Sequence, residues 1–106
     1  MSHPLIIRPE AEADLAEAFE WYEDRKAGLG HEFLAEIQVV LRSIVQNPRR
    51  HPILYRDARR VLTRRFPYKV YFIVEDERVE VLGVVHVRRD PQTWQQRVKS
   101  CPPRPN

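Results

Sequence analysis

Apolar residues recur every three or four positions in two segments of the first half of the chain, which is the spacing of one face of a helix. The first segment begins at Pro9 with acidic residues behind it, as suits a first helical turn, and Gly28 and Gly30 end it. The second segment, residues 31–47, stops before Pro48. Because few residues separate the two segments, they predict an antiparallel helical hairpin. The apolar positions are Ala11, Leu15, Ala18, Phe19, Tyr22, Phe33, Ile37, Val40, Leu41 and Ile44.

The second half of the chain is rich in Val, Ile, Tyr and Phe and is typical of strands. Residues 59–66, 68–75 and 79–87 predict three strands joined by short links into an antiparallel meander. Residues 48–58 contain two prolines and no periodicity, so they are expected to form a connector. With a short strand at "PLIIR", the predicted order is β-α-α-β-β-β. This is an α+β fold in which the helical hairpin packs on one face of a small antiparallel sheet and leaves the other face open or half open.

Alternation along the strands predicts which side chains reach that open face. On the last strand, one set is uniformly apolar or small and is assigned to the helices. His86 and Arg88 belong to the other set and are expected on the open face, and Lys69 and Tyr71 join them from the middle strand. The pattern of residues 59–66 leaves the two faces of that strand unassigned. The set assigned to the helices is Val79, Val81, Gly83, Val85 and Val87.

Charge divides the chain at the same boundary. Residues 1–48 hold four basic and nine acidic residues, a net charge of −5, whereas residues 49–106 have a net charge of +8. This asymmetry favours an anionic partner that binds the second half of the chain. The simpler explanation is that Glu is common in helices and that the strands happen to contain many Arg residues. Arginine forks match phosphate and carboxylate geometry. The basic residues expected to converge from the three strands are Arg59, Arg60, Arg64, Arg65, Lys69, Arg88 and Arg89.

Other classes of chemistry lack their sequence patterns. Three glycines cannot supply a phosphate-binding loop, and the four histidines are scattered rather than spaced as metal ligands, so no cofactor or metal is expected. The alternative for His86 is that it is a surface histidine with no functional role.

Length and the ends of the chain complete the prediction. The 106 residues indicate one domain, assigned to residues 1–98, with a short helical turn within 91–100 and a flexible tail at 99–106. A single cysteine, Cys101, indicates a reducing compartment, and the N-terminus lacks a signal peptide, so the expected location is cytoplasmic, with no membrane partner.

Three short segments of the sequence resemble those of a known family. They are Ala11-x-x-Asp14-Leu15, the run from Arg65 to Phe72 ("RFPYKVYF"), and "HVRRDP" from His86. Together, and over most of the chain, they resemble the RelE/ParE superfamily of toxins from type II toxin–antitoxin systems. The long helical hairpin and the phrase "RRFPYKVYF…HVRRDP" are most similar to the ParE-like, plasmid-stabilisation branch.

The resemblance implies a toxin that traps DNA gyrase on cleaved DNA, is not a hydrolase, and is neutralised by a small cognate antitoxin. An alternative is a RelE-like, metal-independent mRNA endoribonuclease on the ribosome, in which Lys69, His86 and Arg88 would act. That branch often has a C-terminal tyrosine, and this chain has none after Tyr71. A toxin-derived nucleic-acid-binding or inactive domain is the third possibility. Oligomerisation through the helical hairpin is also possible. The residues expected to bind target or antitoxin are Arg60, Arg64, Arg65, Lys69, Tyr71, His86, Arg88 and Arg89.

Overall fold

The computed structural model describes residues 4–88 and has the α+β architecture expected from the sequence. The helical turn and tail expected after residue 90 lie outside the described residues, as does Arg89. The elements are β1 (Leu5–Ile7), α1 (Pro9–Arg25), α2 (Leu29–Gln46), the 3₁₀ turn η1 (Pro48–Arg50), β2 (Ile53–Tyr55), β3 (Ala58–Leu62), β4 (Tyr68–Glu75) and β5 (Arg78–His86).

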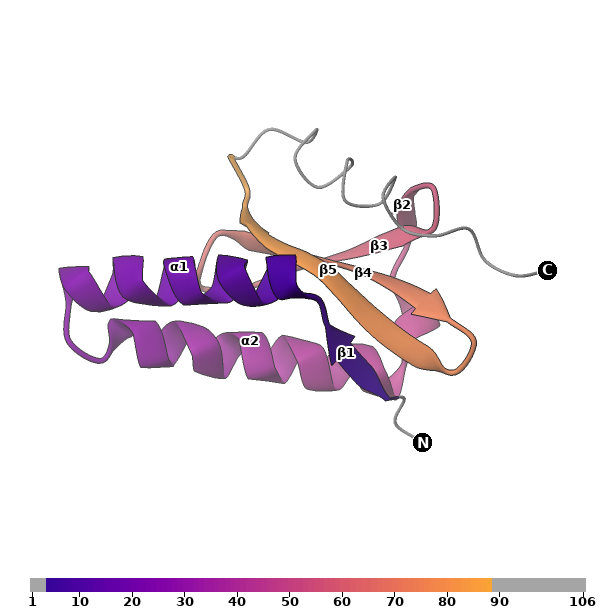
Figure 1. Cartoon of the computed structure of the whole chain (residues 1–106), viewed down its shortest axis with the longest axis horizontal. Helices are drawn as coiled ribbons and strands as arrows, with labels where there is room; N and C mark the ends of the chain where they lie inside the picture. The colour runs from indigo at the N-terminus through magenta and orange to yellow at the C-terminus, as the bar shows by residue number, and fades with distance from the viewer. Residues whose placement is uncertain (1–3, 89–106) are drawn as a thin grey trace.

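The two helices form the predicted antiparallel hairpin, which lies along one side of the sheet (Figure 1). Their apolar faces are buried, with Phe33 and Ile44 fully enclosed. Gly30 does not end the first helix; it lies inside α2, where an added Cβ would stand 2.7 Å from the ring and carbonyl oxygen of Phe19. The absence of a side chain at Gly30 therefore permits the close approach of the helices. No helix within residues 4–88 is long and apolar enough to cross a membrane.

The sheet contains five strands in the order β1-β5-β4-β3-β2, with β1 parallel to β5 and the other pairs antiparallel. The connector predicted for residues 48–58 was wrong, because Ile53–Tyr55 pairs with β3 as an edge strand. A three-residue strand is too short to show a period in the sequence. β3 also ends at Leu62 rather than at residue 66, so Arg64 and Arg65 lie in the turn before β4.

A β-bulge in β5 changes the predicted faces of the last strand. Tyr71 pairs with Gly83 but the next residue, Phe72, pairs with Val81, so Leu82 is an extra residue on β5. A one-residue insertion moves every later side chain to the opposite face. Val85 therefore leaves the helix side, against the prediction. His86 pairs with Tyr68 and turns toward the helices, not toward the open face.

The face away from the helices is not an open surface. It carries a second buried cluster, in which Tyr71 is only 1% exposed. The prediction that Tyr71 is available for binding was therefore wrong. The continuous apolar run of residues 70–74 is typical of a strand covered on both faces, whereas a one-sided strand would alternate. The cluster contains Ala58, Tyr71, Ile73, Leu82 and Val85, with Tyr55 packed against it.

Candidate functional site

Two kinds of polar surface meet at one end of the sheet, where β5 ends beside the turn from β3 to β4. The amide of Val87 donates to the carbonyl of Pro67 at 2.9 Å, and the amide of Thr63 donates to the carbonyl of Tyr68 at 3.0 Å. The first bond holds the end of β5 beside the start of β4, and the second closes the turn from β3 to β4. An aromatic pocket lies on the helix side of this end. Cations lie at the same end of the sheet, and one of them, Lys69, is on the opposite face from the pocket.

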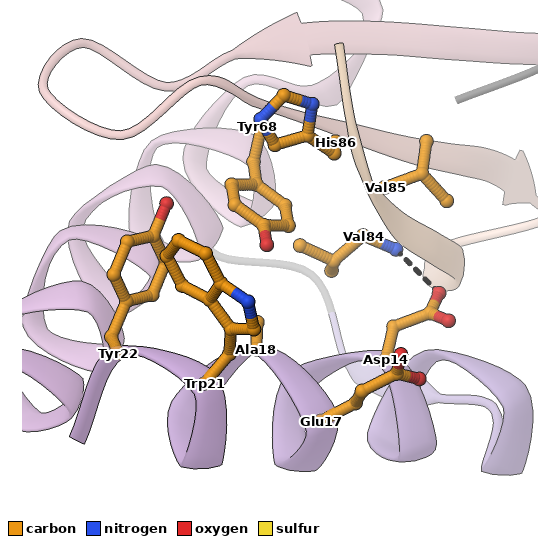
Figure 2. A pocket seen from close by; sticks show the side chains of 9 residues that line it. All are labelled: Asp14, Glu17, Ala18, Trp21, Tyr22, Tyr68, Val84, Val85 and His86. Atoms are coloured by element: carbon orange, nitrogen blue, oxygen red, sulfur yellow. Dashed lines mark hydrogen bonds between the residues drawn. The ribbon is translucent and has the colours of Figure 1, made fainter. Parts of the chain in front are cut away.

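The pocket lies between α1 and the last residues of β5 and has a volume of about 280 Å³ (Figure 2). Trp21 and Tyr22 approach it from α1, while Tyr68 and His86 approach it from the sheet. Trp21 is half exposed, so the pocket opens to solvent. The full lining is Asp14, Glu17, Ala18, Trp21, Tyr22, Tyr68, Val84, Val85 and His86.

Asp14 forms the polar floor of this pocket. It is 9% exposed, and its Oδ2 accepts a hydrogen bond from the amide of Val84 at 2.9 Å (Figure 2). Val84 follows the bulge at Leu82, so the carboxylate joins α1 to β5 where the strand pairing is irregular. A buried carboxylate requires such a donor, because burial without a partner costs several kcal/mol (roughly 2–7 for a neutral polar group and more for a charge).

The tyrosines and His86 form a packed aromatic wall. Tyr22 and Tyr68 meet with ring centroids 6.2 Å apart, and Tyr68 meets the ring of His86 edge-on at 5.4 Å. Burial raises the pKa of Tyr22; a hydrogen bond with Tyr68 opposes this rise and the charge of Glu36 adds to it. The Nδ1 atom of His86 accepts a hydrogen bond from the amide of Arg88 at 3.1 Å. That bond holds the imidazole against the chain end of β5.

Three of the predicted basic residues lie at the end of the sheet and are called the basic rim: Arg64, Lys69 and Arg88. Arg64 and Arg88 are exposed, and Lys69 is half-buried. Lys69 pairs with Val85 and Leu62, which places it on the face away from the helices.

Arg60 lies farther along that face. It pairs with Tyr71, and its guanidinium is hydrogen-bonded to the Tyr71 hydroxyl. Burial raises the pKa of Tyr71, and the charge and hydrogen bond of Arg60 oppose this rise. Tyr71 thus holds Arg60 in place from within the second cluster rather than offering its own surface to a partner.

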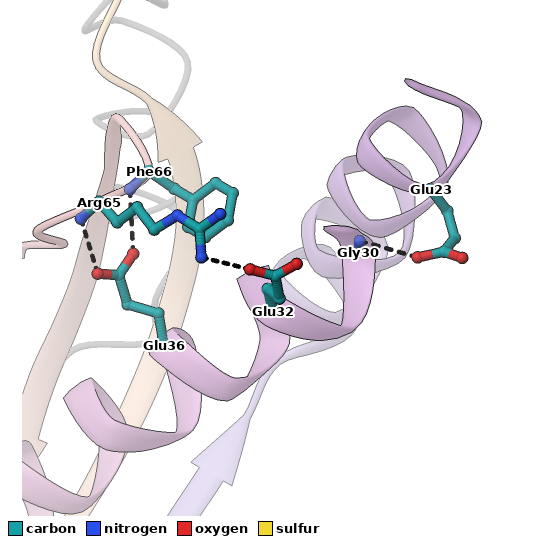
Figure 3. Close-up of polar contacts among 6 residues, drawn as sticks. All are labelled: Glu23, Gly30, Glu32, Glu36, Arg65 and Phe66. Atoms are coloured by element: carbon teal, nitrogen blue, oxygen red, sulfur yellow. Dashed lines mark hydrogen bonds and ion pairs between the residues drawn. The ribbon is translucent and has the colours of Figure 1, made fainter. Parts of the chain in front are cut away.

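Arg65 and Arg59 do not join the basic rim. Arg65 turns toward α2 and pairs with Glu32, with both side chains about half exposed (Figure 3). Arg59 donates to the carbonyls of Arg49 and His51, at 3.2 and 2.5 Å, and so ties β3 to the segment before β2. The expected convergence of all the basic residues on one surface was therefore wrong for these two. The strand register predicted from the sequence could not show that Glu32, on the helical hairpin, forms an ion pair with Arg65.

Glutamates of the hairpin hold the turns beside the site. The carboxylate of Glu36 accepts from the amides of Arg64, Arg65 and Phe66, at 3.2, 2.7 and 3.1 Å, and so fixes the turn between β3 and β4. Figure 3 shows the bonds from Arg65 and Phe66. Glu23 accepts from the amides of Gly28 and Gly30 at the start of α2. These bonds, chiefly that from Gly28, lower the pKa of Glu23. The negative carboxylate suits the positive end of the helix dipole.

The arrangement does not bring the three proposed ribonuclease residues onto one point. Tyr68 and Lys69 are neighbours on β4, so their side chains leave opposite faces of the sheet, and His86 shares the face of Tyr68. Lys69 and His86 are thus separated by the sheet. Within residues 4–88, no group of three His, Cys, Asp or Glu side chains is placed to hold a metal ion.

Sequence reasoning did not identify Glu17, Trp21, Tyr22 or Asp14 as site residues. The periodicity of α1 placed Tyr22 in the core, and Trp21 and Glu17 were given no functional role. Asp14 did carry a signal, because it falls on the apolar face of the helix between Ala11 and Ala18. A charged residue at a buried position is rarely left without a partner.

Comparison with known proteins agrees with this architecture. Residues 5–91 match the family model described as the ParE toxin of the type II toxin–antitoxin system parDE. A solved chain from the chromosomal ParDE system of P. aeruginosa superposes with a TM-score of 0.74 at 18% identity, over 82% of this chain and 98% of that chain. No curated protein matches. The chain belongs to the ParE toxin family of type II toxin–antitoxin systems.

Proposed function

We propose that the chain is a toxin that inhibits DNA gyrase in the cytoplasm and is neutralised by a cognate antitoxin. The family match carries this proposal, because it spans most of the chain and includes both the pocket and the basic rim. Gyrase binds DNA, and the rim offers cations that suit an anionic surface of a protein–DNA complex. The antitoxin is expected to be a short protein encoded beside the toxin, with a DNA-binding N-terminal part.

The separation of Lys69 from His86 supports gyrase over the ribosome as the target. Cleavage of mRNA through the 2′-OH requires an acid, a base and a phosphate-binding cation around one phosphate. In this chain Lys69 and the imidazole of His86 lie on opposite faces of the sheet, and Nδ1 of His86 accepts a hydrogen bond from the amide of Arg88. The geometry therefore favours action by binding and not by hydrolysis.

Two assays with the same purified chain test the proposal. One measures supercoiling of relaxed plasmid by gyrase and the accumulation of cleaved DNA. The other measures cutting of mRNA on programmed ribosomes. Inhibited supercoiling with intact mRNA is the expected result, and cuts in the mRNA with unaffected gyrase would replace the proposal with the ribonuclease alternative. If both assays are negative and expression leaves growth unchanged, the chain is an inactive or nucleic-acid-binding relative.

A further inference from the structure

The pocket beside α1 differs in charge from the rest of this end of the sheet. Its lining includes the carboxylates of Asp14 and Glu17 and contains no Lys or Arg among the described residues. The cations of the basic rim lie outside it: Arg64 in the turn before β4, Arg88 after β5, and Lys69 on the other face of the sheet. A partner of uniform negative charge would therefore suit the rim but not the pocket.

The walls of the pocket are aromatic, with Trp21, Tyr22, Tyr68 and His86 contributing rings. The faces of such rings attract cations, and Trp does so most strongly. The chain itself provides an example at this position, because the guanidinium of Arg25, which is not among the lining residues, lies 3.5 Å from the centroid of the Trp21 ring. Aromatic faces combined with carboxylates are the usual environment for a bound guanidinium or ammonium group.

The volume of the pocket and the buried carboxylate of Asp14 indicate which kind of chemical group can bind there. A volume of about 280 Å³ lies just below the usual range for small-molecule sites, about 300–1,000 Å³, and fits one side chain inserted by a protein partner. Asp14 at the floor is nine-tenths buried already. An aliphatic anchor would remove the remaining water from two carboxylates without replacing it, whereas a guanidinium would donate hydrogen bonds to them.

We propose that this pocket binds an arginine side chain of the antitoxin, placed between the aromatic rings and paired with Glu17 and Asp14. The antitoxin segment would thus carry a cation for the pocket beside the acidic residues that suit the basic rim. The identity of the partner rests on the proposed function; the affinity of the pocket for a guanidinium does not.

The test uses NMR of the full ¹⁵N-labelled chain titrated with N-acetyl-arginine amide, and with N-acetyl-citrulline amide as the uncharged probe of the same shape. The arginine probe is expected to shift the indole N–H of Trp21 and the amide of Val84, with an affinity about fivefold higher than that of citrulline. Glu17→Gln should weaken arginine binding about threefold and leave citrulline unchanged. Glu20→Gln makes the same charge change at an exposed position of α1 that does not line the pocket, and should have no effect.

Equal affinity for the two probes, or an equal effect of Glu17→Gln and Glu20→Gln, would overturn the assignment of a cation to the pocket. An equimolar amount of antitoxin should abolish the shifts at Trp21. Arginine binding that persists in the complex would overturn the antitoxin as its source. A chain that binds arginine but fails to inhibit gyrase refutes the proposed function alone, and one that inhibits gyrase without discriminating the probes refutes the pocket assignment alone.

Discussion

The carboxylate of Asp14 on α1 accepts a hydrogen bond from the amide of Val84 on β5 at 2.9 Å, across 70 positions of sequence. Val84 comes after the extra residue Leu82 on β5. This insertion reverses the faces of the side chains that follow it, so His86 lies on the helix side. The helix is therefore joined to the sheet at the point where the strand changes face. Both residues of this bond line the pocket.

Replacing Asp14 should destabilise the fold. Asp14→Ala leaves the buried amide of Val84 without its acceptor, and the free energy of unfolding should fall by about 1–3 kcal/mol. Asp14→Asn retains an acceptor oxygen and should cost less. Urea denaturation monitored by circular dichroism measures both. Asp24→Ala removes an exposed carboxylate from the same helix and serves as the control; a loss at Asp14 no larger than at Asp24 would contradict the role given to this bond.

Glu36 should stabilise the turn between β3 and β4 more than the neighbouring ion pair does. Glu36→Ala removes the acceptor for three backbone amides and should lower the free energy of unfolding by about 1–2 kcal/mol. Glu32→Ala removes only the half-exposed pair with Arg65 and should cost about 0–1 kcal/mol. Hydrogen exchange at the amide of Phe66 should accelerate in the Glu36 variant alone. Equal exchange in the two variants would show that the turn does not depend on Glu36.

Gly30 should resist substitution for a reason that differs from that at Gly28. The Cβ of Gly30→Ala would meet the Phe19 ring and backbone at 2.7 Å, so the helices must separate, at a cost of about 1–3 kcal/mol. Gly28 has open space around its Cβ but a φ of +90°, so Gly28→Ala should cost about 1 kcal/mol from backbone strain alone. The ring resonances of Phe19 should shift in the Gly30 variant only. Unchanged Phe19 resonances there would indicate that the helices do not pack as closely as described.

Acid should destabilise the fold through His51. Its Nε2 is buried without a hydrogen-bond partner, and burial, followed by the charges of Arg50 and Arg59, lowers its pKa below the ordinary 6.5. The unfolded chain therefore binds more protons than the folded chain below pH 6.5, so this contribution to stability is complete above 6.5 and declines as the pH falls toward the lower folded value.

The titration of His51 can be measured directly from its Cε1–H resonance, and its midpoint should lie below 6.5. His51→Gln cannot gain a proton there and should lose less stability between about pH 7.5 and pH 5.5 than the parent chain does. A midpoint above the ordinary value would reverse the expected sign and refute this prediction.

The helices and most of the strands could be predicted because apolar residues recur in each with the spacing typical of that element. The side chains on β5 could not be assigned to faces by alternation, since one inserted residue at Leu82 reverses all that follow. Gly83, next to the insertion, was the available signal, because glycine within a strand often marks a bulge.

The contacts that build the site join residues far apart in the sequence, so no local sequence pattern predicts them. The basic residues could be counted but not paired, and nothing local to Arg65 indicates that Glu32 will neutralise it. The three amides held by Glu36 are backbone groups that any residue would supply. Tyr71 was misplaced because its strand was taken as one-sided, although all five residues from Val70 to Val74 are apolar and buried.

We propose that this ParE-family chain inhibits gyrase through its basic rim, and a supercoiling assay with two matched triple variants tests this most directly. Arg64→Gln/Lys69→Gln/Arg88→Gln removes the rim, and Lys26→Gln/Arg42→Gln/Arg50→Gln removes the same charge from exposed sites elsewhere. Both should fold, since substitutions at exposed positions change stability by about 0.5 kcal/mol or less each, and five of the six positions are exposed. Circular dichroism checks that the half-buried Lys69 position also tolerates Gln. The rim variant should need roughly tenfold more protein for half-inhibition, with the control close to the parent chain. Equal inhibition by the two variants, or no inhibition by the parent chain, would contradict the account.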